Sequence, residues 1–334
     1  MVTIKEVEKL AKVSVATVSR VMNKTDNVSQ ETKQRVQAAI KTLSYSPNLL
    51  GRSLRRNETK RILVLLNTIS NEFYSRILKG IEKRALENGY TVMICMTHGN
   101  DKLEEKYIEM IKTRLVDGAI FLTTEQSGII LKDELDGLNV VQACEPAKDF
   151  KTPTVCINNE KAAYDATCYL IELGHKKIAF LGAAGIYQSS DDRATGYKRA
   201  MNEASLPIKP EFIINEGFSY NAGARAVEKL ISENNELPTA CFCISDSCAA
   251  GAIRTFIKNG ISVPNDMSVM GFDNTKLSQI FLPAITTVKQ PQLDIGYIAM
   301  DLLLKVMRSE TILNPNITLP YKIIKRESTQ SISD

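Results

Sequence analysis

The segment from Thr3 to Asn23 carries small, polar and basic side chains at a helical spacing that suits contact with DNA. Val15 and Ala16 would stand at the start of a helix, where they could touch base edges or thymine methyl groups. Arg20, one turn further along, could grip O6 and N7 of a guanine with both arms of its guanidinium. Hydroxyl and amide side chains nearby suit phosphate oxygens, which position a protein on the duplex. The candidate DNA contacts here are Thr3, Ser14, Val15, Ala16, Thr17, Ser19, Arg20 and Asn23.

Three short helices would hold these side chains in place. Thr3 and Glu6 have the spacing of a capping box at the start of a first helix, and Ser14 can cap a second one. A third helix is expected from about Ser29 to Leu43. The apolar side chains predicted to face a shared core are Ile4, Val7, Leu10, Ala11, Val18, Val21, Met22, Val36, Ile40 and Leu43. Residues 1–46 therefore predict a helix-turn-helix DNA-binding domain, and the alternative is a small helical bundle with a solvated basic face.

The distribution of charge indicates a polyanionic partner for the N-terminal region only. Residues 1–60 hold 12 Lys and Arg against 5 Asp and Glu, although the whole chain carries a net charge of only +4. The remainder is therefore slightly acidic, as expected if the contacts with DNA are confined to the first 60 residues.

Composition limits the other classes of function. Hydrophobic residues make up 44% of the chain, enough for packed cores, but there is no run of about 18 apolar residues that could span a membrane. The N-terminus lacks the apolar stretch of a signal peptide, so we expect a cytoplasmic protein, associated with the nucleoid through DNA. The seven cysteines are scattered, and His98 and His175 lie in unrelated segments. This pattern favours neither disulfides nor a metal site, and we expect no cofactor.

From Arg61 onward, apolar strands alternate with amphipathic helices. Continuous apolar runs of this kind are buried on both faces, as in parallel sheets. The predicted strands are 62–66, 91–95, 118–122, 140–143, 177–181, 240–244 and 268–272. Helices such as 76–88 and 164–173 lie between them, with Gly89 and Gly174 as C-terminal caps. The repeated units predict an α/β fold with a doubly wound architecture, in which ligands bind beyond the carboxyl ends of the strands.

The N-terminal motifs resemble a known family of DNA-binding proteins. The segment from Val13 to Asn23, VSVATVSRVMN, looks like the recognition segment of the lactose/galactose repressor (LacI/GalR) family, and Leu43 to Asn48 is similar to its L-x-Y-x-P-N motif. Two residues depart from the pattern. Glu8 stands where a small alanine is usual, and Lys12 replaces the turn glycine. Lys12 must therefore adopt a turn conformation that glycine takes more easily.

Residues 47–60 form a short charged connector, in which Asn48 to Arg56 could make a helix of marginal stability. By resemblance this is the hinge helix that orders on operator DNA, with two copies from a dimer in the minor groove. Leu54 matches the leucine that wedges between base pairs and kinks the duplex. Asn48 and Gly51 complete the predicted DNA contacts of this segment. The alternative is a flexible charged linker.

Motifs of the same family continue through the rest of the chain. They include Ser70 to Tyr74, Val116 to Ile120, Leu173 to Ala179, Asp192 to Tyr197, Val263 to Asp273 and Thr286 to Pro291. The resemblance implies the fold of periplasmic sugar-binding proteins, in which two α/β lobes are joined by three crossing strands around a ligand cleft. It places one lobe at about 61–160 plus 291–320, and the other at about 161–290 plus the C-terminal strand. Residues 61–334 would thus form an effector-binding and dimerisation domain.

The candidate effector site combines polar and aromatic side chains. Arg193 offers a bidentate fork to vicinal hydroxyls or an anionic group, and Asp273 can accept hydrogen bonds from ligand hydroxyls. Phe73 and Phe218 could stack on a sugar or a base. By position-wise resemblance the cleft is also lined by Asn71, Tyr74, Glu145, Ser245, Asp246 and Gln290. Ser245 stands where the family commonly has asparagine, a departure that bears on sugar specificity.

The motifs of common enzymes, such as a P-loop, HExxH and GxSxG, are absent, so the sequence does not predict an enzyme. It predicts a homodimeric transcriptional repressor that binds a pseudo-palindromic operator and responds to a small effector, a sugar or related metabolite. The alternative is a global carbon-catabolite regulator that binds a serine-phosphorylated carrier protein. Segments starting at Gly271 and Asp294 resemble that subgroup of the family. However, Asp301 stands where the subgroup has an arginine for the phosphoserine, and it would repel a phosphate.

Overall fold

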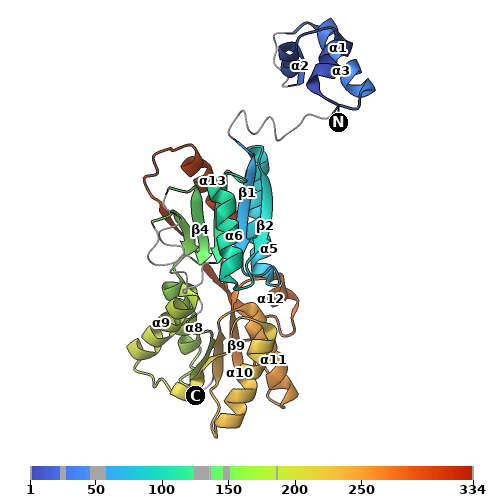
Figure 1. The fold of residues 1–334 in the computed structure, drawn as a ribbon. Helices are drawn as coiled ribbons and strands as arrows, with labels where there is room; N and C mark the ends of the chain where they lie inside the picture. The colour runs from blue at the N-terminus through green and yellow to red at the C-terminus, as the bar shows by residue number, and fades with distance from the viewer. Residues whose placement is uncertain are drawn as a thin grey trace. The chain divides into compact units, whose positions relative to one another are not determined.

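The computed structural model describes residues 2–22, 28–45, 58–123, 135, 137–145, 151–185 and 187–332. The chain divides into two compact units, Met1–Thr59 and Lys60–Asp334, called here the head and the body (Figure 1). In the described residues no helix is long and apolar enough to cross a lipid bilayer.

Within residues 2–22 and 28–45 the head contains three helices, α1 (Ile4–Ala11), α2 (Val15–Met22) and α3 (Gln30–Thr42). The first two helices begin at the predicted caps. The backbone N–H of Thr3 donates to Glu6 Oε2 at 2.6 Å, and the N–H of Thr17 donates to Ser14 Oγ at 3.2 Å. These contacts satisfy backbone donors that have no partner within the helices. The predicted helix-turn-helix is therefore present.

A tight turn at Lys12 separates α1 from α2. Lys12 has φ 51° and ψ 48°, the left-handed region that glycine adopts most easily. The buried core of the head is made of Val7, Ala11, Val18, Val21, Val36 and Ala39. The prediction that Leu10 faces this core is wrong, because its side chain is 50% exposed. Val7 and Ala11 define the buried face of α1, and Leu10 lies at the edge of that face.

In the part of the body that the structure describes, strands form two six-stranded sheets. The first sheet has the order β11-β5-β4-β3-β1-β2, and its strands pair in parallel. The strands are β1 (Arg61–Leu66), β2 (Thr91–Met96), β3 (Gly118–Thr123), β4 (Val140–Glu145), β5 (Thr154–Ile157) and β11 (Asn316–Leu319). The helices of this lobe are α5 (Glu72–Glu87), α6 (Asp101–Lys112) and α13 (Gln292–Met307). This sheet and its helices are called the first lobe.

The second sheet has the order β12-β10-β9-β8-β6-β7, with β12 antiparallel to β10 and the other strands parallel. Its strands are β6 (Ile178–Gly182), β7 (Ile213–Asn215), β8 (Ala240–Cys243), β9 (Ser268–Asp273), β10 (Thr286–Lys289) and β12 (Lys322–Ile324). The helices are α8 (Asn159–Glu172), α9 (Gln188–Glu203), the short 3-10 helix η1 (Pro210–Phe212), α10 (Tyr220–Glu233), α11 (Asp246–Lys258) and α12 (Lys276–Ile280). Together they form the second lobe.

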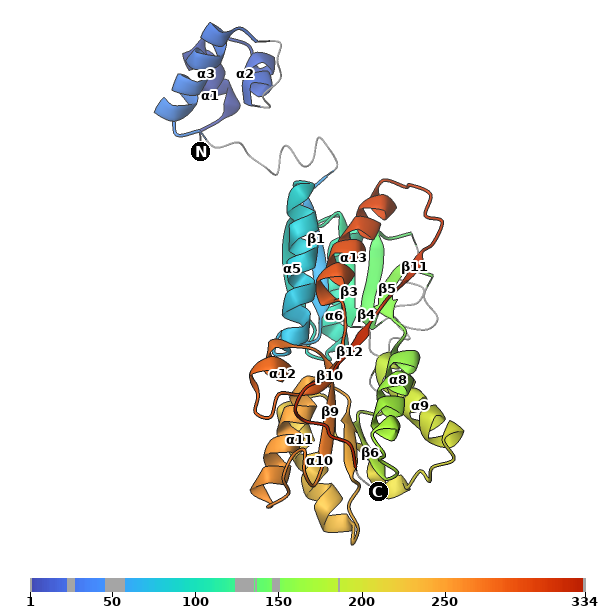
Figure 2. The same ribbon diagram turned by 180° about the vertical axis from the view of Figure 1, so that it is seen from behind.

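The described chain passes between the lobes in three places: from β5 to α8, from β10 to α13, and from β11 to β12 (Figure 2). Each lobe therefore combines strands that lie far apart in the sequence. In the first lobe, for example, Val155 of β5 is the register partner of Ile317 in β11.

The seven predicted strands are all present, with ends within two residues of those expected. All but β2 are recognisable because they are buried on both faces, and β3 and β4, for example, are buried at every residue. The edge strand β2 is half-exposed and stands out by its apolar residues alone. The two predicted glycine caps are also confirmed. Gly89 after α5 has φ 73°, and Gly174 after α8 has φ 94°, both in the left-handed region.

Helices α5 and α13 pack side by side in the first lobe (Figure 2). Their backbones are in contact at two glycines. A Cβ atom added to Gly80 would lie 2.1 Å from the carbonyl oxygen of Leu293. One added to Gly296 would lie 2.0 Å from the carbonyl oxygen of Ile77. Both distances are far below van der Waals contact, so only glycine allows the two helices to approach this closely.

Candidate DNA-binding and effector sites

The predicted DNA contacts of the head lie on the outer side of α2 and at the starts of α1 and α2. Ala16 and Arg20 are exposed one turn apart on α2, whereas Val18 and Val21 face the core. Ser14 and Thr3 are exposed caps, and the remaining three, Val15, Thr17 and Ser19, are half-buried. Asn23, Asn48, Gly51 and Leu54 lie outside the described residues.

A cavity of about 320 Å³ lies where the carboxyl ends of strands from both lobes meet. Its described lining consists of Asn67, Thr68, Ser70, Asn71, Tyr74, Glu145, Tyr187, Phe218, Ser219, Tyr220 and Ser247. The first lobe supplies the segment after β1 and the end of β4. The second lobe supplies the starts of α9, α10 and α11. This is the place that doubly wound sheets favour for ligands, and the volume suits a small molecule.

Among the described residues, hydrogen bonds cross between the lobes near this cavity. Asn67 Nδ2 donates to the hydroxyl of Tyr187 at 3.0 Å. The hydroxyl of Ser189 donates to Glu145 Oε1 at 2.7 Å, and the backbone N–H of Ser189 donates to Glu145 Oε2 at 3.3 Å. A further contact joins the backbone N–H of Leu277 to the carboxylate of Glu72 at 3.3 Å. Polar contacts thus link the two lobes around the cavity.

Aromatic rings form one side of the cavity. Tyr187 and Phe218 meet edge to face, with ring centroids 5.9 Å apart and an interplanar angle of 61°. The buried ring of Tyr74 packs in the same way against Phe73, at 5.2 Å and 72°. Rings held in this manner offer apolar faces to a sugar or a base, and each tyrosine also carries a polar hydroxyl, which in Tyr187 accepts from Asn67.

Charged side chains are buried at the cavity and behind it. Burial raises the pKa of Glu145, whereas Arg193 and the hydrogen bonds from Ser189 act in the opposite direction. Burial also raises the pKa of Asp273 well above its ordinary value, again opposed by the charge of Arg193. Arg193 thus lies in the field of both carboxylates. Its Nε donates to Asn159 Oδ1 at 3.0 Å.

Of the predicted effector residues, Asn71, Tyr74, Glu145 and Phe218 line the cavity. Arg193, Asp273 and Gln290 are buried and bonded within the protein. Arg193 Nη1 donates to the carbonyl oxygen of Ile244 at 2.7 Å, and Gln290 Nε2 donates to Asp273 Oδ1 at 2.8 Å. Ligand contact by these three residues stays a prediction.

The other three predicted residues also have structural contacts. Ser245 caps α11 by accepting from the N–H of Cys248 at 3.1 Å, and its hydroxyl donates to the carbonyl oxygen of Phe218 at 2.7 Å. Asp246 accepts from the hydroxyl of Thr287 at 2.5 Å, and burial raises its pKa to about 6. Phe73 is 6% exposed and belongs to the core of the first lobe. Through its bond to the carbonyl oxygen of Phe218, Ser245 helps to position the ring of Phe218 at the cavity.

Seven lining residues were not predicted: Asn67, Thr68, Ser70, Tyr187, Ser219, Tyr220 and Ser247. Asn67, Thr68 and Ser70 follow β1 directly, so their place beyond a strand end was a usable signal. Ser219 caps α10, and its hydroxyl accepts from the N–H of Ala222 at 3.1 Å. No local pattern marks Tyr187. Across the described residues, no group of three or more His, Cys, Asp and Glu side chains could hold a metal ion.

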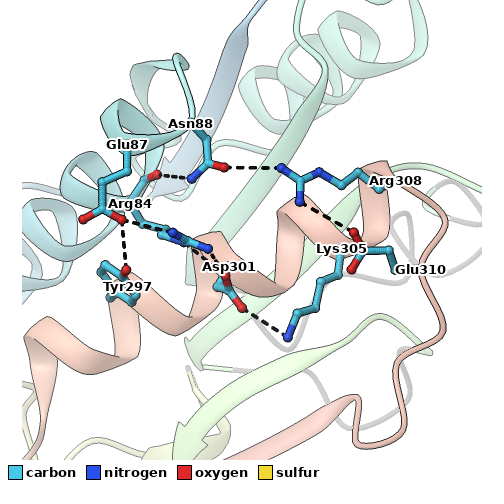
Figure 3. A network of polar contacts seen from close by, with 8 residues as sticks. All are labelled: Arg84, Glu87, Asn88, Tyr297, Asp301, Lys305, Arg308 and Glu310. Carbon is cyan, nitrogen blue, oxygen red and sulfur yellow. Dashed lines mark hydrogen bonds and ion pairs between the residues drawn. The ribbon is translucent and has the colours of Figure 1, made fainter.

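Asp301 lies at the centre of a polar network between α5 and α13 (Figure 3). Its carboxylate accepts from Arg84 Nε at 3.0 Å and from Arg84 Nη2 at 2.5 Å, and it forms an ion pair with Lys305 at 3.2 Å. Tyr297 donates to Glu87 at 2.9 Å, and Glu87 pairs with Arg84 in turn. Arg84, Lys305 and Arg308 are therefore each paired with a carboxylate in this network.

A helix-turn-helix head and a two-lobed body with a cavity between its lobes together define a DNA-binding transcriptional regulator with a sensor domain. Two family models match the chain: bacterial regulatory proteins of the lacI family over residues 3–48, and a periplasmic binding protein-like domain over residues 167–329. The chain belongs to the lacI family of bacterial regulatory proteins, whose members are regulators and not enzymes.

Full-length relatives and a solved structure agree with this assignment. The HTH-type transcriptional regulator RegA of Clostridium saccharobutylicum is 38% identical over 98% of this chain and 99% of its own length. Catabolite control protein A of Priestia megaterium is likewise 38% identical, over 98% and 99%. The lac repressor dimer bound to operator and the anti-inducer ONPF superposes with a TM-score of 0.89, at 26% identity over 99% of both chains.

Proposed function

We propose that this chain is a homodimeric repressor whose affinity for a pseudo-palindromic operator is set by a sugar or related metabolite bound in the interlobe cavity. The observation that carries the proposal is that both lobes line the cavity, Asn71 and Tyr74 from the first and Phe218 and Ser247 from the second. A ligand there contacts both lobes, so it stabilises one arrangement of the lobes over another. Effector and operator then change each other's affinity by the same factor. The protein would act in the cytoplasm, on the nucleoid.

The head is proposed to read the major groove with α2, through Ala16 and Arg20. Their exposure on one face of the helix supports this role, since a recognition helix must present side chains away from its own core. Residues 47–60 are proposed as the hinge, with Leu54 as the minor-groove wedge.

Exposed apolar side chains support self-association of the body. β2 is an edge strand, and beside it a groove of about 470 Å³ is lined by α5 and β2 residues that include Leu86 and Ile94. These two side chains are 65% and 50% exposed. In the second lobe Ile280 and Leu282 are 65% and 80% exposed. Apolar side chains gathered in this way are typical of protein–protein interfaces.

Gel-shift titration of DNA selected by the full-length protein tests the proposal. Arg20→Ala should weaken binding by about 1 to 3 kcal/mol and relax base preference at one position of each half-site. Arg35→Ala, which removes the same charge from an exposed site on α3, is the matched control and should keep that base preference. A metabolite that stabilises the body should shift operator affinity in the wild type. Failure to select any DNA sequence would overturn the proposal.

A second variant separates the hinge from the effector site. Leu54→Ala should weaken operator binding, because the kink then loses its wedge, while leaving effector affinity in calorimetric titration unchanged. Unchanged operator affinity in this variant would contradict the wedge assignment.

A further inference from the structure

The first turn of α9, in the second lobe, is hydrogen-bonded to the carboxylate of Glu145 from the first lobe. Tyr187, the N-cap residue, makes no side-chain capping hydrogen bond, although the N–H groups at a helix start need acceptors. Glu145 of the first lobe fills this place. The hydroxyl of Ser189 donates to one of its oxygens at 2.7 Å, and the backbone N–H of Ser189 donates to the other at 3.3 Å.

The start of a helix of this length is a favourable place for an anion, since its N–H groups and its dipole both attract negative charge. A phosphate or carboxylate on a ligand would find such a place attractive. Here Glu145 already occupies it, with its side chain 5% exposed and both oxygens engaged. Because Glu145 also lines the cavity, a ligand anion would meet a carboxylate at the point where it could otherwise bind.

The rest of the described lining is neutral. It consists of hydroxyl groups, two amides and four aromatic rings, with no Lys, Arg or His among the lining residues that the structure describes. A volume of about 320 Å³ is room for about ten water molecules, which suits a molecule the size of a monosaccharide or a nucleoside. Hydroxyl and amide groups pair with ligand hydroxyls, and the rings Tyr187 and Phe218 offer apolar contact.

We propose that Glu145 is a specificity-determining residue that restricts the effector to unphosphorylated polar molecules, such as free sugars or nucleosides. This inference rests on the proposed function, since it concerns the ligand of the same cavity. Glu145 acts in two ways: it occupies the anion site of α9, and its hydrogen bonds with Ser189 tie the lobes together around the ligand. A phosphorylated analogue must either remain beside the carboxylate or displace it. Either course weakens binding by at least about tenfold, or about 1.4 kcal/mol.

Calorimetric titration of the full-length chain with matched pairs tests this. The pairs are ribose and ribose 5-phosphate, glucose and glucose 6-phosphate, and adenosine and AMP, with inorganic phosphate as a separate probe. Glu145→Gln removes the charge but keeps the shape and an oxygen for Ser189, so it should still fold. Glu72→Gln is the matched control, because it neutralises another carboxylate that contacts the opposite lobe but lies outside the cavity lining.

In the wild type and in Glu72→Gln, we expect an unphosphorylated compound to bind at least about tenfold more tightly than its phosphorylated partner. In Glu145→Gln the ratio should fall by about tenfold, and inorganic phosphate should begin to bind. The inference is overturned if the wild type prefers the phosphorylated partner, if Glu145→Gln leaves the ratio unchanged, or if no compound of these pairs binds. Gel-shift titration of the same protein preparations with operator DNA tests the proposed function separately, because it does not depend on which compound binds.

Discussion

Gly296→Ala tests whether the backbones of α5 and α13 are in contact. An alanine Cβ at this position would lie 2.0 Å from the carbonyl oxygen of Ile77, 2.9 Å from the carbonyl carbon of Ile77 and 3.0 Å from the nitrogen of Ile81. These are backbone atoms within a helix, so they cannot rotate away. To restore ordinary contact at roughly 3.5 Å, the helices must separate by about 1 Å or more.

The size of the effect follows from two opposing terms. Alanine is a better helix former than glycine by about 1 kcal/mol, which favours the variant. Overpacking costs about 1 to 3 kcal/mol, and a gap of ~1 Å forfeits roughly a quarter to a half of the dispersion contacts across it. Side chains facing that gap, such as Ile77, Ile81 and Ile295, are fully buried. We expect the repulsive terms to dominate, with a net loss of about 2 to 4 kcal/mol.

Denaturant unfolding of the full-length chain measures this loss, and thermal unfolding of the body should occur roughly 3 to 7 °C lower. Glu82→Ala, on the exposed face of the neighbouring helix α5, is the control and should change stability by less than about 0.5 kcal/mol. If Gly296→Ala is as stable as the wild type, or is stabilised by the helix propensity of alanine, the helices are not in backbone contact and the reasoning fails.

Three further predictions concern other parts of the chain. Lys12→Gly should stabilise the head by about 0.5 to 1 kcal/mol, because φ 51° lies in the left-handed region that glycine adopts at less cost. Hydrogen exchange of α1 and α2 measures this gain. The control Lys9→Gly, in the middle of α1, should destabilise the head instead. Burial lowers the pKa of His175, so the unfolded chain binds more protons and stability should fall as the pH drops below about 6.5. Denaturant midpoints at pH 7.5 and 5.5 should differ less in His175→Gln. When the wild-type protein is immobilised on a column, it should not retain a serine-phosphorylated carrier protein. The Asp301→Arg variant should retain it, because the substitution adds a cation and removes the carboxylate that accepts from Arg84. Retention by the wild type would support the catabolite-regulator alternative.

The strands that no apolar run marks in the sequence are short or half-exposed, and of these the C-terminal strand, β12, was expected only from the family resemblance. β11 has alternating exposed and half-buried residues, and β12 has only three residues. Neither contains an apolar run long enough to stand out. Their positions depend on partners far away in the chain, β5 for β11 and β10 for β12. A local pattern holds no information about such partners, so these strands become visible only when the sheets are assembled.

The effector site shows a similar division. Motifs place Arg193 and Asp273 near the cavity, but they do not indicate which way the side chains point. In the structure both are bonded inside the protein, Arg193 to Asn159 and Asp273 to Gln290. By contrast, the resemblance places Asn71 and Tyr74 in the cleft, and in the structure both line the cavity from the start of α5. Tyr187 could not be foreseen, since its position depends on how α9 meets the first lobe.

The return of the chain to each lobe near its C-terminus has a consequence for protein synthesis. The first sheet is complete only after residue 319 has been made, and the second only after residue 324. The head, by contrast, is closed by contacts within its first 45 residues. At ~10 residues per second, its core is therefore available about half a minute before either lobe can be completed. During that interval a nascent chain has a folded reader of DNA without its sensor, so effector control begins only when translation is nearly finished.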